Sequence, residues 1–281
     1  MKNTITYLLA MFFTGLFLIS CDSQNMVSSD SQIVISSDPQ VDSSPGIYRV
    51  VLTDAPAAYD AVYIDVQEVR VHSDSDADTD ENEWIVIQSE PVRVNLLDLT
   101  NGRQELLGEE ELQPGRYQQI RLILGTNNEI VIDGESHQLR TPGAQQSGLK
   151  LKTDAEIESG KIYTLLLDFD ASRSVVKTGA GGYLLKPVIR AVQLDETGSV
   201  AGNIEPAESL PWVYTIADDD TIAGTQAEED GDFLMIGIPS GTYQISIEPS
   251  EGEYNSTVIP QVKVSAPDTT HLDPITLDSN D

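Results

Sequence analysis

Four aspartates that alternate along one segment are the first residues whose types and spacing could support chemistry. They are Asp74, Asp76, Asp78 and Asp80. Alternating carboxylates are how calcium-binding loops collect hard oxygen ligands. Such loops also carry glycine at the sixth position and an acidic residue at the twelfth, where this segment has Thr79 and Ile85. The segment is therefore a candidate weak calcium site, and a solvated acidic hairpin loop explains the same pattern.

A second pair of carboxylates is the arrangement to weigh for catalysis, although in so acidic a chain such a pair carries little information. Asp168 and Asp170 alternate at the end of an apolar run, so on a strand they would share one face. A hydrolase would need a deep pocket around this pair and Arg190. The three histidines, none with a metal-ligand neighbour at suitable spacing, are His72, His137 and His271. The sequence also lacks a nucleophile elbow and a phosphate loop, so we expect no enzyme activity.

Trp212 and Tyr214 are the candidate ligand-binding aromatics. Exposed aromatic rings on one face of a β-sandwich can stack on sugars, and two residues at i and i+2 of a strand share a face. Packing at the core or rim is the alternative for any one aromatic, and aromatic residues make up only 6% of the chain. A carbohydrate is thus a candidate partner for this pair.

Cys21 is the only cysteine of the chain, so no intramolecular disulfide can form. It follows Lys2, an apolar run over residues 7–19 and Ser20. These are the parts of a secretory signal, whose apolar region is about 7–15 residues long, whereas a membrane-spanning helix needs about 20. Residues 1–20 are therefore predicted to be a signal peptide.

Ser20 and Cys21 resemble the lipobox of bacterial lipoproteins, in which the cysteine carries the acyl chains. The resemblance implies palmitate-type lipidation at Cys21 and attachment to a membrane. Several acyl chains are needed for durable attachment, since one chain holds only marginally. The resemblance implies a cell-envelope location, and the outer membrane is favoured. Asp22 is the residue that retains lipoproteins at the inner membrane in some bacteria, so that alternative stays open.

The charge of the chain restricts its partners. The formal net charge is -30 at pH 7, from 46 acidic and 16 basic residues. Such a surface repels nucleic-acid phosphates and anionic lipid headgroups, so nucleic acid is excluded as a partner. An envelope protein, a neutral glycan or a divalent cation remains compatible. A solubilising surface is the simplest interpretation.

The pattern of short β-branched and aromatic runs, punctuated by glycine, proline, asparagine and aspartate, predicts an all-β chain with two β-sandwich domains in tandem. Residues 21–44, rich in serine and acidic residues, are predicted to form a flexible tether. A first domain is expected over 45–195 and a second over 199–281. The expected strands are 48–53, 61–72, 84–88, 92–97, 117–124, 129–132, 162–169 and 183–194, then 200–204, 211–216, 232–236, 242–247, 258–264 and 275–277. A phase slip at Gln67-Glu68 predicts a β-bulge, and residues 102–112 are the best candidate helix.

The second domain resembles the carboxypeptidase-regulatory-like module. The residues that carry the resemblance are Val200-Ala201-Gly202, Glu229-Asp230-Gly231-Asp232-Phe233 and Ile238-Pro239-Ser240-Gly241-Thr242-Tyr243. The resemblance implies a small transthyretin-like (prealbumin-like) sandwich of seven strands, a carbohydrate-binding-like fold, without catalytic activity.

The first domain is similar to an uncharacterised family of bacterial lipoprotein domains, domain of unknown function 4382. The matching segments include Leu52-Thr53-Asp54-Ala55-Pro56, Pro114-Gly115-Arg116-Tyr117, Leu167-Asp168-Phe169-Asp170-Ala171 and Leu185-Lys186-Pro187-Val188-Ile189. This resemblance implies a fold and a location but no activity. Together, these observations predict a lipid-anchored, non-catalytic binding or scaffolding protein without a cofactor. The alternatives are a glycan-binding accessory protein and a hydrolase with an unrecognised carboxylate site.

Overall fold

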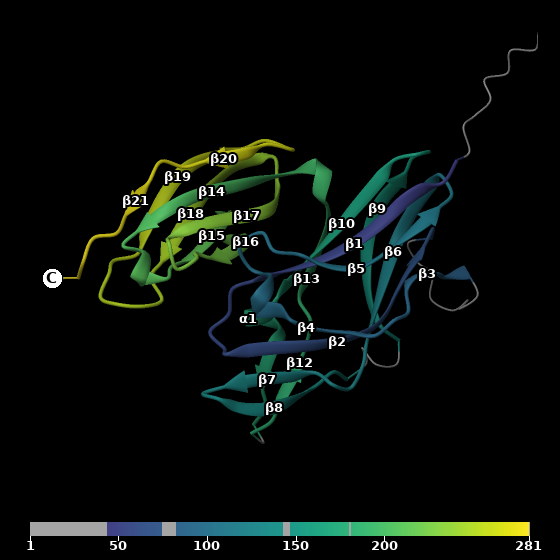
Figure 1. The fold of residues 1–281 in the computed structure, drawn as a ribbon, viewed down its shortest axis with the longest axis horizontal. Helices are drawn as coiled ribbons and strands as arrows, with labels where there is room; N and C mark the ends of the chain where they lie inside the picture. The colour runs from purple at the N-terminus through teal and green to yellow at the C-terminus, as the bar shows by residue number, and fades with distance from the viewer. Residues whose placement is uncertain (1–43, 75–82, 143–146, 180, 281) are drawn as a thin grey trace, which may run out of the picture. The chain divides into compact units, whose positions relative to one another are not determined.

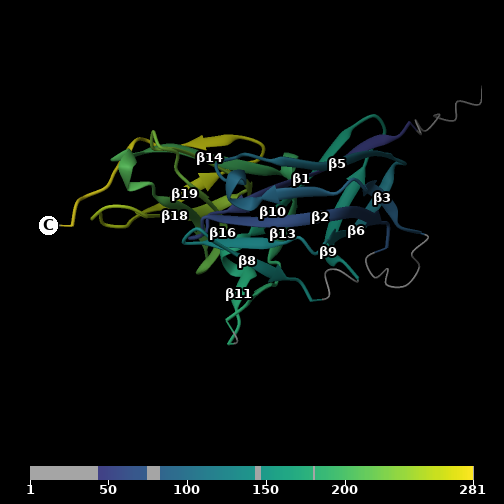
Figure 2. The same ribbon diagram turned by 60° about the horizontal axis from the view of Figure 1, so that its bottom comes forward.

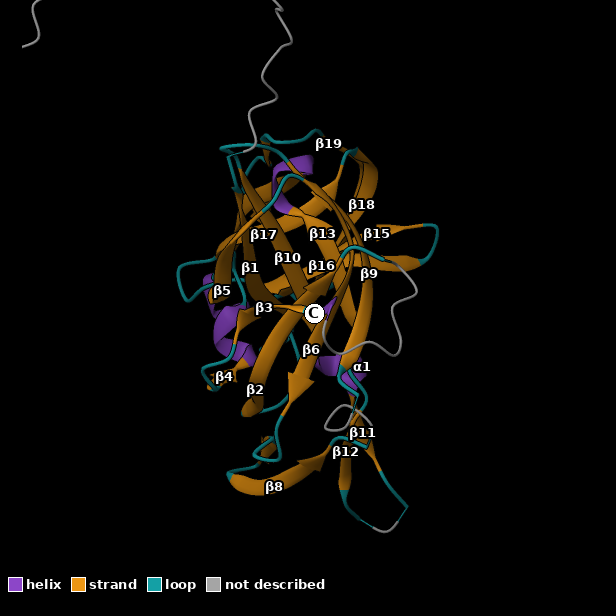
Figure 3. Ribbon diagram, turned by 90° about the vertical axis from the view of Figure 1, so that its right-hand side faces the viewer, coloured by secondary structure: helices purple, strands orange, loops and turns teal. Residues whose placement is uncertain are grey.

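The computed structural model describes residues 44–74, 83–142, 147–179 and 181–280. Strands make up most of this part of the chain, as the orange arrows in Figure 3 show. The prediction of an all-β chain with two sandwiches in tandem is confirmed. The described helical segments are one turn long; they include α1 (Ala171–Ser174) and 3-10 turns at Leu96–Leu99, Leu194–Glu196 and Ala207–Ser209.

The first sandwich, drawn from purple to green in Figure 1, pairs a four-stranded sheet with a nine-stranded one. The four-stranded sheet has the order β13 (Ile189–Gln193), β10 (Ile162–Asp170), β1 (Gly46–Ala55) and β5 (Glu105–Leu112). The larger sheet has the order β11 (Val175–Lys177), β12 (Tyr183–Leu185), β8 (Glu135–Arg140), β7 (Glu129–Ile132), β2 (Ala61–His72), β6 (Gly115–Leu124) and β9 (Leu149–Ile157). Two further short strands, β3 (Ile85–Gln88) and β4 (Val92–Asn95), also pair with β2.

Alternate residues of the two facing sheets form one core. Leu52 of β1 and Leu167 of β10 pack in the same cluster as Ile64 of β2 and Leu122 of β6, and all four side chains have no exposed surface. This arrangement follows from the period of two in each strand, which turns every second side chain inward. Burying such a side chain stabilises the fold by about 1.5–3 kcal/mol.

The strand β2 is the centre of the larger sheet, and Figure 2 shows it beside β6. Its register shifts between Val66 and Glu68, which confirms the β-bulge predicted from the phase slip. The bulge lets the two halves of β2 pair with different neighbours: β7 and β4 along its first half, and β6 and β3 along its second.

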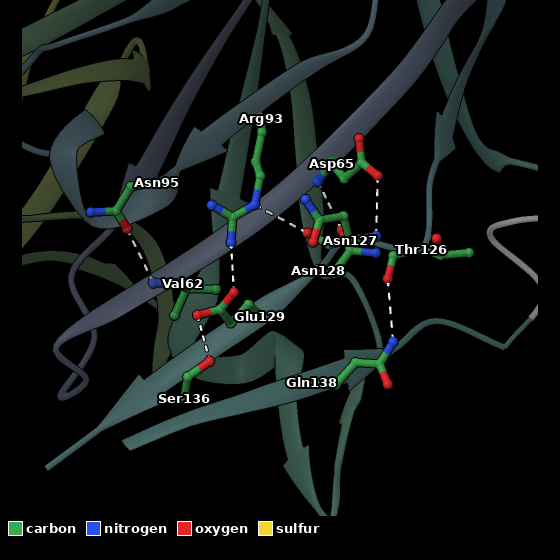
Figure 4. Close-up of polar contacts among 10 residues, drawn as sticks. All are labelled: Val62, Asp65, Arg93, Asn95, Thr126, Asn127, Asn128, Glu129, Ser136 and Gln138. Carbon is green, nitrogen blue, oxygen red and sulfur yellow. Dashed lines mark hydrogen bonds and ion pairs between the residues drawn. The ribbon is translucent and has the colours of Figure 1, made fainter. Parts of the chain in front are cut away.

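A polar network fastens the turn between β6 and β7 to β2 (Figure 4). The backbone N–H of Asp65 donates to Asn128 Oδ1 at 2.8 Å, and the Asp65 carboxylate accepts from the backbone N–H of Asn127 at 3.1 Å. Arg93 of β4 donates through Nε to the carbonyl of Asn127 at 3.2 Å and through Nη2 to Glu129 at 2.8 Å. The network satisfies the polar groups of the turn, which lies beside the bulge.

The predicted helix over 102–112 is wrong, because residues Glu105–Leu112 form β5. This strand runs antiparallel to β1 with a register shift between Val50 and Val51, and Leu107 and Leu112 are its buried residues. The irregular spacing of the two leucines weakens the period of two, and pairing with β1 overrides the local preference for a helix. The predicted strands also did not include β8, β9, β11, β16 (Asp220–Gln226) and β20 (Thr269–His271).

The second sandwich, green to yellow in Figure 1, consists of two four-stranded sheets. One contains β17 (Asp232–Pro239), β14 (Thr197–Glu205), β20 (Thr269–His271) and β21 (Ile275–Thr276). The other has the order β16 (Asp220–Gln226), β15 (Trp212–Ala217), β18 (Gly241–Glu248) and β19 (Thr257–Val264). Its core includes Val200 and Phe233 from the first sheet and Val213, Ile245 and Ile247 from the second.

Candidate functional site

A loop of the first sandwich forms polar contacts to the second through Asn101 and Arg103. The backbone N–H of Asn101 donates to Thr225 Oγ1 at 2.6 Å, and its Nδ2 donates to Glu228 at 2.9 Å. Asn101 Oδ1 accepts from the backbone N–H of Leu234, and Arg103 pairs with Glu228 at 2.5 Å. Asn101 has a φ of 57°, in the left-handed region that asparagine tolerates better than most residues. Four polar contacts thus join this loop to β16 and β17 and the turn between them.

Arg190 of β13 forms a second link between the sandwiches. It donates through Nη1 to the carbonyl of Gly237 in β17 at 2.6 Å and through Nη2 to Asp168 at 2.7 Å. Asp168 stands directly opposite in β10. Burial raises the pKa of Asp168, and the charge and hydrogen bond of Arg190 oppose that rise. Glycine is required at position 237 because a side chain there would collide with the fully buried Leu166.

Asp168, Asp170 and Arg190 do line a common pocket, of about 100 Å³. The pocket is small, and both carboxylates already have structural partners. Asp170 caps α1 by accepting from the backbone N–H of Arg173 at 2.9 Å and from Ser172 Oγ at 2.7 Å. Asp168 is paired with Arg190. No group of three or more His, Cys, Asp or Glu residues in the described part of the chain is arranged to hold a metal ion.

Asp54 is the most deeply buried carboxyl group near this pocket, with 2% of its surface exposed. The parallel pairing of β1 and β10 brings their carboxyl ends to the same edge of the sheet, where Asp54 Oδ1 accepts from the backbone N–H of Ala171 at 3.0 Å. Within the described residues, Oδ2 has no hydrogen-bond partner. Burial raises the pKa of Asp54 well above its ordinary value; the Ala171 bond opposes the rise, and nearby Asp168 and Asp170 add to it.

The raised pKa of Asp54 predicts a specific dependence of stability on pH. Because the unfolded chain ionises this group near the ordinary carboxyl value and the folded chain does so only at higher pH, the free energy of unfolding falls as pH rises between the two pKa values. The slope from this one group is at most about 1.4 kcal/mol per pH unit. Asp54→Asn should remove this contribution, so its free energy of unfolding should change less between about pH 4.5 and 8.

Urea unfolding of the wild type and Asp54→Asn across this pH range measures the difference in slope. Asp98→Asn is the control, because Asp98 is an exposed carboxylate of the same domain and its replacement should leave the slope unchanged. Equal slopes for wild type and Asp54→Asn would contradict the assignment of a raised pKa to Asp54.

A larger groove, of about 480 Å³, lies beside Trp212 and draws residues from both sandwiches. The first sandwich contributes the loop between β1 and β2 and the end of β7, and the second contributes β15, β16 and the loop after β18. The lining residues are Ala57, Ala58, Tyr59, Asp60, Ile132, Asp133, Trp212, Gln226, Pro249, Ser250 and Glu251. The groove therefore combines two aromatic rings with three carboxylates, an amide and a hydroxyl group.

Trp212 is held at the groove by its place in the sheet. It begins β15, where it pairs with Gln226 of β16 on one side and Glu248 of β18 on the other. Its side chain is half-buried, and in the described structure no hydrogen bond occupies its indole N–H. Gln226, the cross-strand neighbour that shares its face, donates through Nε2 to the carbonyl of Leu210 at 3.2 Å.

Tyr214, the other candidate aromatic, is not among the residues that line this groove. It pairs with Gly224, and its ring lies so close over that glycine that a side chain there would collide with Tyr214 and crowd Pro56 of the first sandwich. Burial raises the pKa of Tyr214 to about 12, with smaller contributions from Glu248 and Asp170. Trp212 therefore lines the groove, whereas Tyr214 packs over Gly224 of the neighbouring strand.

The other residues singled out from the sequence do not join this groove. The backbone N–H of Asp74 donates to His72 Nδ1 at 2.9 Å, while Asp76, Asp78 and Asp80 lie outside the described residues, as does Cys21. The calcium prediction therefore stays a prediction. Trp84 is 7% exposed, beneath the Arg121 guanidinium at 4.0 Å.

The groove residues that no sequence motif marks come from loops. Tyr59 and Asp60 follow the turn at Pro56, Asp133 opens the Asp-Gly turn between β7 and β8, and Glu251 lies in the loop after β18. The Asp133-Gly134 pair was a visible turn signal. Nothing local showed that these three loops meet.

None of the described helices has the length and apolar character needed to cross a membrane. No protein in the curated set matches the chain in sequence.

Three solved structures of bacterial proteins show distant similarity to the chain. One is the TIE protein of Bacillus anthracis, with 11% identity and a TM-score of 0.22 over 84% of this chain and 34% of that one. A fimbrial protein of Bacteroides ovatus shows 7% identity and a TM-score of 0.23 over 83% of this chain and 50% of the other. A cohesin–X-dockerin complex of Acetivibrio cellulolyticus shows 20% identity and a TM-score of 0.25 over 30% of this chain, and the match spans 59% of that chain. These similarities are too distant to bear on function.

A family model matches the chain over residues 46–187, which span β1 to β12 and so nearly the whole first sandwich. This confirms the resemblance found in the first domain, and the chain belongs to the family described as "Domain of unknown function (DUF4382)".

Proposed function

We propose that this protein is a non-catalytic, lipid-anchored binding protein of the cell envelope that holds a carbohydrate in the groove beside Trp212. The observation that carries the proposal is the placement of Trp212 and Tyr59, from different sandwiches, in one groove of about 480 Å³. Ligand sites for small molecules occupy about 300–1,000 Å³ and combine apolar walls with a few polar groups.

The chemistry of the lining suits a sugar. The C–H faces of a pyranose pack on aromatic rings, and its hydroxyl groups need hydrogen-bond partners on the rim. Ile132 and Pro249 extend the apolar wall, and Gln226 and Ser250 supply polar side chains. Ser250 Oγ already donates to the carbonyl of Leu210 at 2.5 Å, so its oxygen is oriented as an acceptor.

The groove fits a binding role better than a catalytic one. The three lining carboxylates, Asp60, Asp133 and Glu251, are exposed. A catalytic acid usually needs a carboxyl group whose pKa is raised by burial. The buried carboxyl groups Asp54 and Asp168 lie in contacts between strands and not in this groove. The resemblance of residues 199–281 to a non-catalytic module supports the same role.

A binding screen tests the proposed function. The chain from residue 22 contains every described residue, and we expect it to bind at least one neutral oligosaccharide in calorimetry and in gel electrophoresis with polysaccharide in the gel. Thermal unfolding with the same ligands should show a rise in Tm. If no saccharide binds and none shifts Tm, the carbohydrate proposal fails and a scaffolding role is favoured.

Lipid attachment at Cys21 has its own prediction. In cells that process lipoproteins, the full chain should incorporate radiolabelled palmitate and partition into the detergent phase of Triton X-114. Cys21→Ser removes the sulfur that accepts the acyl chain, so label should be lost and the protein should move to the aqueous phase. Ser20→Ala, which keeps a small residue before the cysteine, is the control. Palmitate incorporation by Cys21→Ser would contradict the assignment.

A further inference from the structure

We infer that the carbohydrate held beside Trp212 carries free amino groups, as an unacetylated hexosamine does. This inference rests on the proposed function and concerns the charge of the ligand. Three of the groove's lining residues are acidic, namely Asp60, Asp133 and Glu251, and no lysine, arginine or histidine is among the lining residues. A ligand ammonium group would therefore meet carboxylates and aromatic rings together.

The three carboxylates are free to accept a ligand cation. In the described part of the chain, none of them forms an ion pair with a basic side chain. Asp60 uses one oxygen to accept from the backbone N–H of Gly134 at 2.8 Å, which leaves its other oxygen available. By contrast, several acidic side chains elsewhere in the first sandwich, such as Glu109 and Glu129, are paired with arginines.

The loop that carries Asp60 and the turn that carries Asp133 are bonded to each other. Asp133 and Gly134 have positive φ angles of 52° and 75°, as the tight hairpin between β7 and β8 requires. The bond from Gly134 to Asp60 fixes this hairpin turn to the loop that precedes β2. Both carboxylates therefore stand on a braced part of the groove, and ordering them costs little entropy when a ligand binds.

Glu251 stands on a braced loop of the second sandwich. The backbone N–H groups of Ser250 and Glu251 both donate to the carbonyl of Ser209, at 3.0 and 3.1 Å. Ser250 Oγ and Gln226 also donate to the carbonyl of Leu210, the residue two positions before Trp212. The loop that carries Glu251 is thus tied to the chain segment that leads into Trp212.

This arrangement discriminates among saccharides by charge. A protonated amine gains charge-assisted hydrogen bonds to carboxylates and can also lie over an aromatic ring. A neutral sugar gains only the stacking on the aromatic ring, without the charge-assisted hydrogen bonds. A uronic acid meets like charges and lacks a basic partner, so it should be rejected.

The decisive experiment compares three oligosaccharides of similar length by calorimetry at about pH 6, where amines are protonated. They are oligomers of glucosamine, of N-acetylglucosamine and of galacturonic acid. We expect the glucosamine oligomer to bind about tenfold more tightly than the acetylated one and the galacturonate oligomer not to bind. Raising the salt concentration to about 0.5 M should weaken only the glucosamine interaction.

Two triple variants separate the groove from the overall charge. Asp60→Asn, Asp133→Asn and Glu251→Gln together should reduce glucosamine binding to the level of the acetylated oligomer and leave the latter unchanged. The control carries Glu90→Gln, Glu110→Gln and Glu111→Gln, three exposed residues outside the groove, and changes the net charge equally. It should keep the preference for the amine. Thermal unfolding of both variants checks that each is folded.

The outcomes distinguish the inference from the proposed function. Equal binding of the acetylated and free amines, or an equal loss in the control variant, overturns the inference while carbohydrate binding stands. The absence of binding by all three oligosaccharides and by the neutral screen overturns both. If the Trp212→Ala variant binds the glucosamine oligomer as tightly as the wild type does, the amine site lies elsewhere, which also overturns the inference.

Discussion

Trp212→Ala is expected to lower the affinity for the bound saccharide by about 30-fold, which corresponds to about 2 kcal/mol. The ring is half-buried at the start of β15 and forms the aromatic wall of the groove. Its removal takes away the surface on which the sugar stacks and leaves the polar groups of the rim in place. Calorimetric titration with the best ligand from the screen measures the loss.

The control for this prediction is Tyr214→Phe. Tyr214 is two residues away on the same strand face, and its ring packs over Gly224. Loss of its hydroxyl keeps that packing, so the affinity should change by less than about threefold. Trp212→Phe should lie between wild type and Trp212→Ala because a smaller ring remains. Unchanged affinity in a folded Trp212→Ala protein would exclude the groove as the binding site.

Arg190→Met is expected to destabilise the fold by about 3 kcal/mol near pH 7. The arginine is the charged partner of Asp168, whose side chain is 12% exposed, and it also donates to the carbonyl of Gly237 in the other sandwich. Methionine keeps most of the apolar stem but leaves a buried carboxylate and a carbonyl without this donor. Urea unfolding followed by circular dichroism measures the change.

Two comparisons make this expectation specific. Arg49→Met removes an ion pair of the same sheet in which both partners are more than a third exposed, and it should cost less than about 1 kcal/mol. The double variant Arg190→Met, Asp168→Leu should recover part of the loss, because no unpaired carboxylate remains. If Arg190→Met costs no more than Arg49→Met, the buried pair does not stabilise the junction.

Most strands of both sandwiches could be predicted, because the alternation of apolar and polar residues is a local property of each segment. The alternation in 61–72 placed β2 within the bounds that the structure shows, and its phase slip marked the bulge. The wrong helix over 102–112 arose where that signal was weak. There, pairing of β5 with β1 decided the conformation, and no property of the segment by itself could show that partner.

The candidate site was predictable only in part. Trp212, a candidate aromatic from its residue type, lines the groove, but Tyr214, which has the same spacing, packs over Gly224 instead. Tyr59, Asp60 and Asp133 had no motif to single them out.

The sequence by itself determined the fold class, the bulge in β2 and the family of the first domain, since each depends on residue types within one segment. It also contains the signal that motivates lipid attachment at Cys21. Only the tertiary structure decided which residues meet: Tyr59 and Glu251 line one groove, and Asp54 is buried where two parallel strands end. Burial and proximity depend on contacts between distant segments, and those contacts form only when the two sandwiches are folded and joined through Asn101 and Arg190.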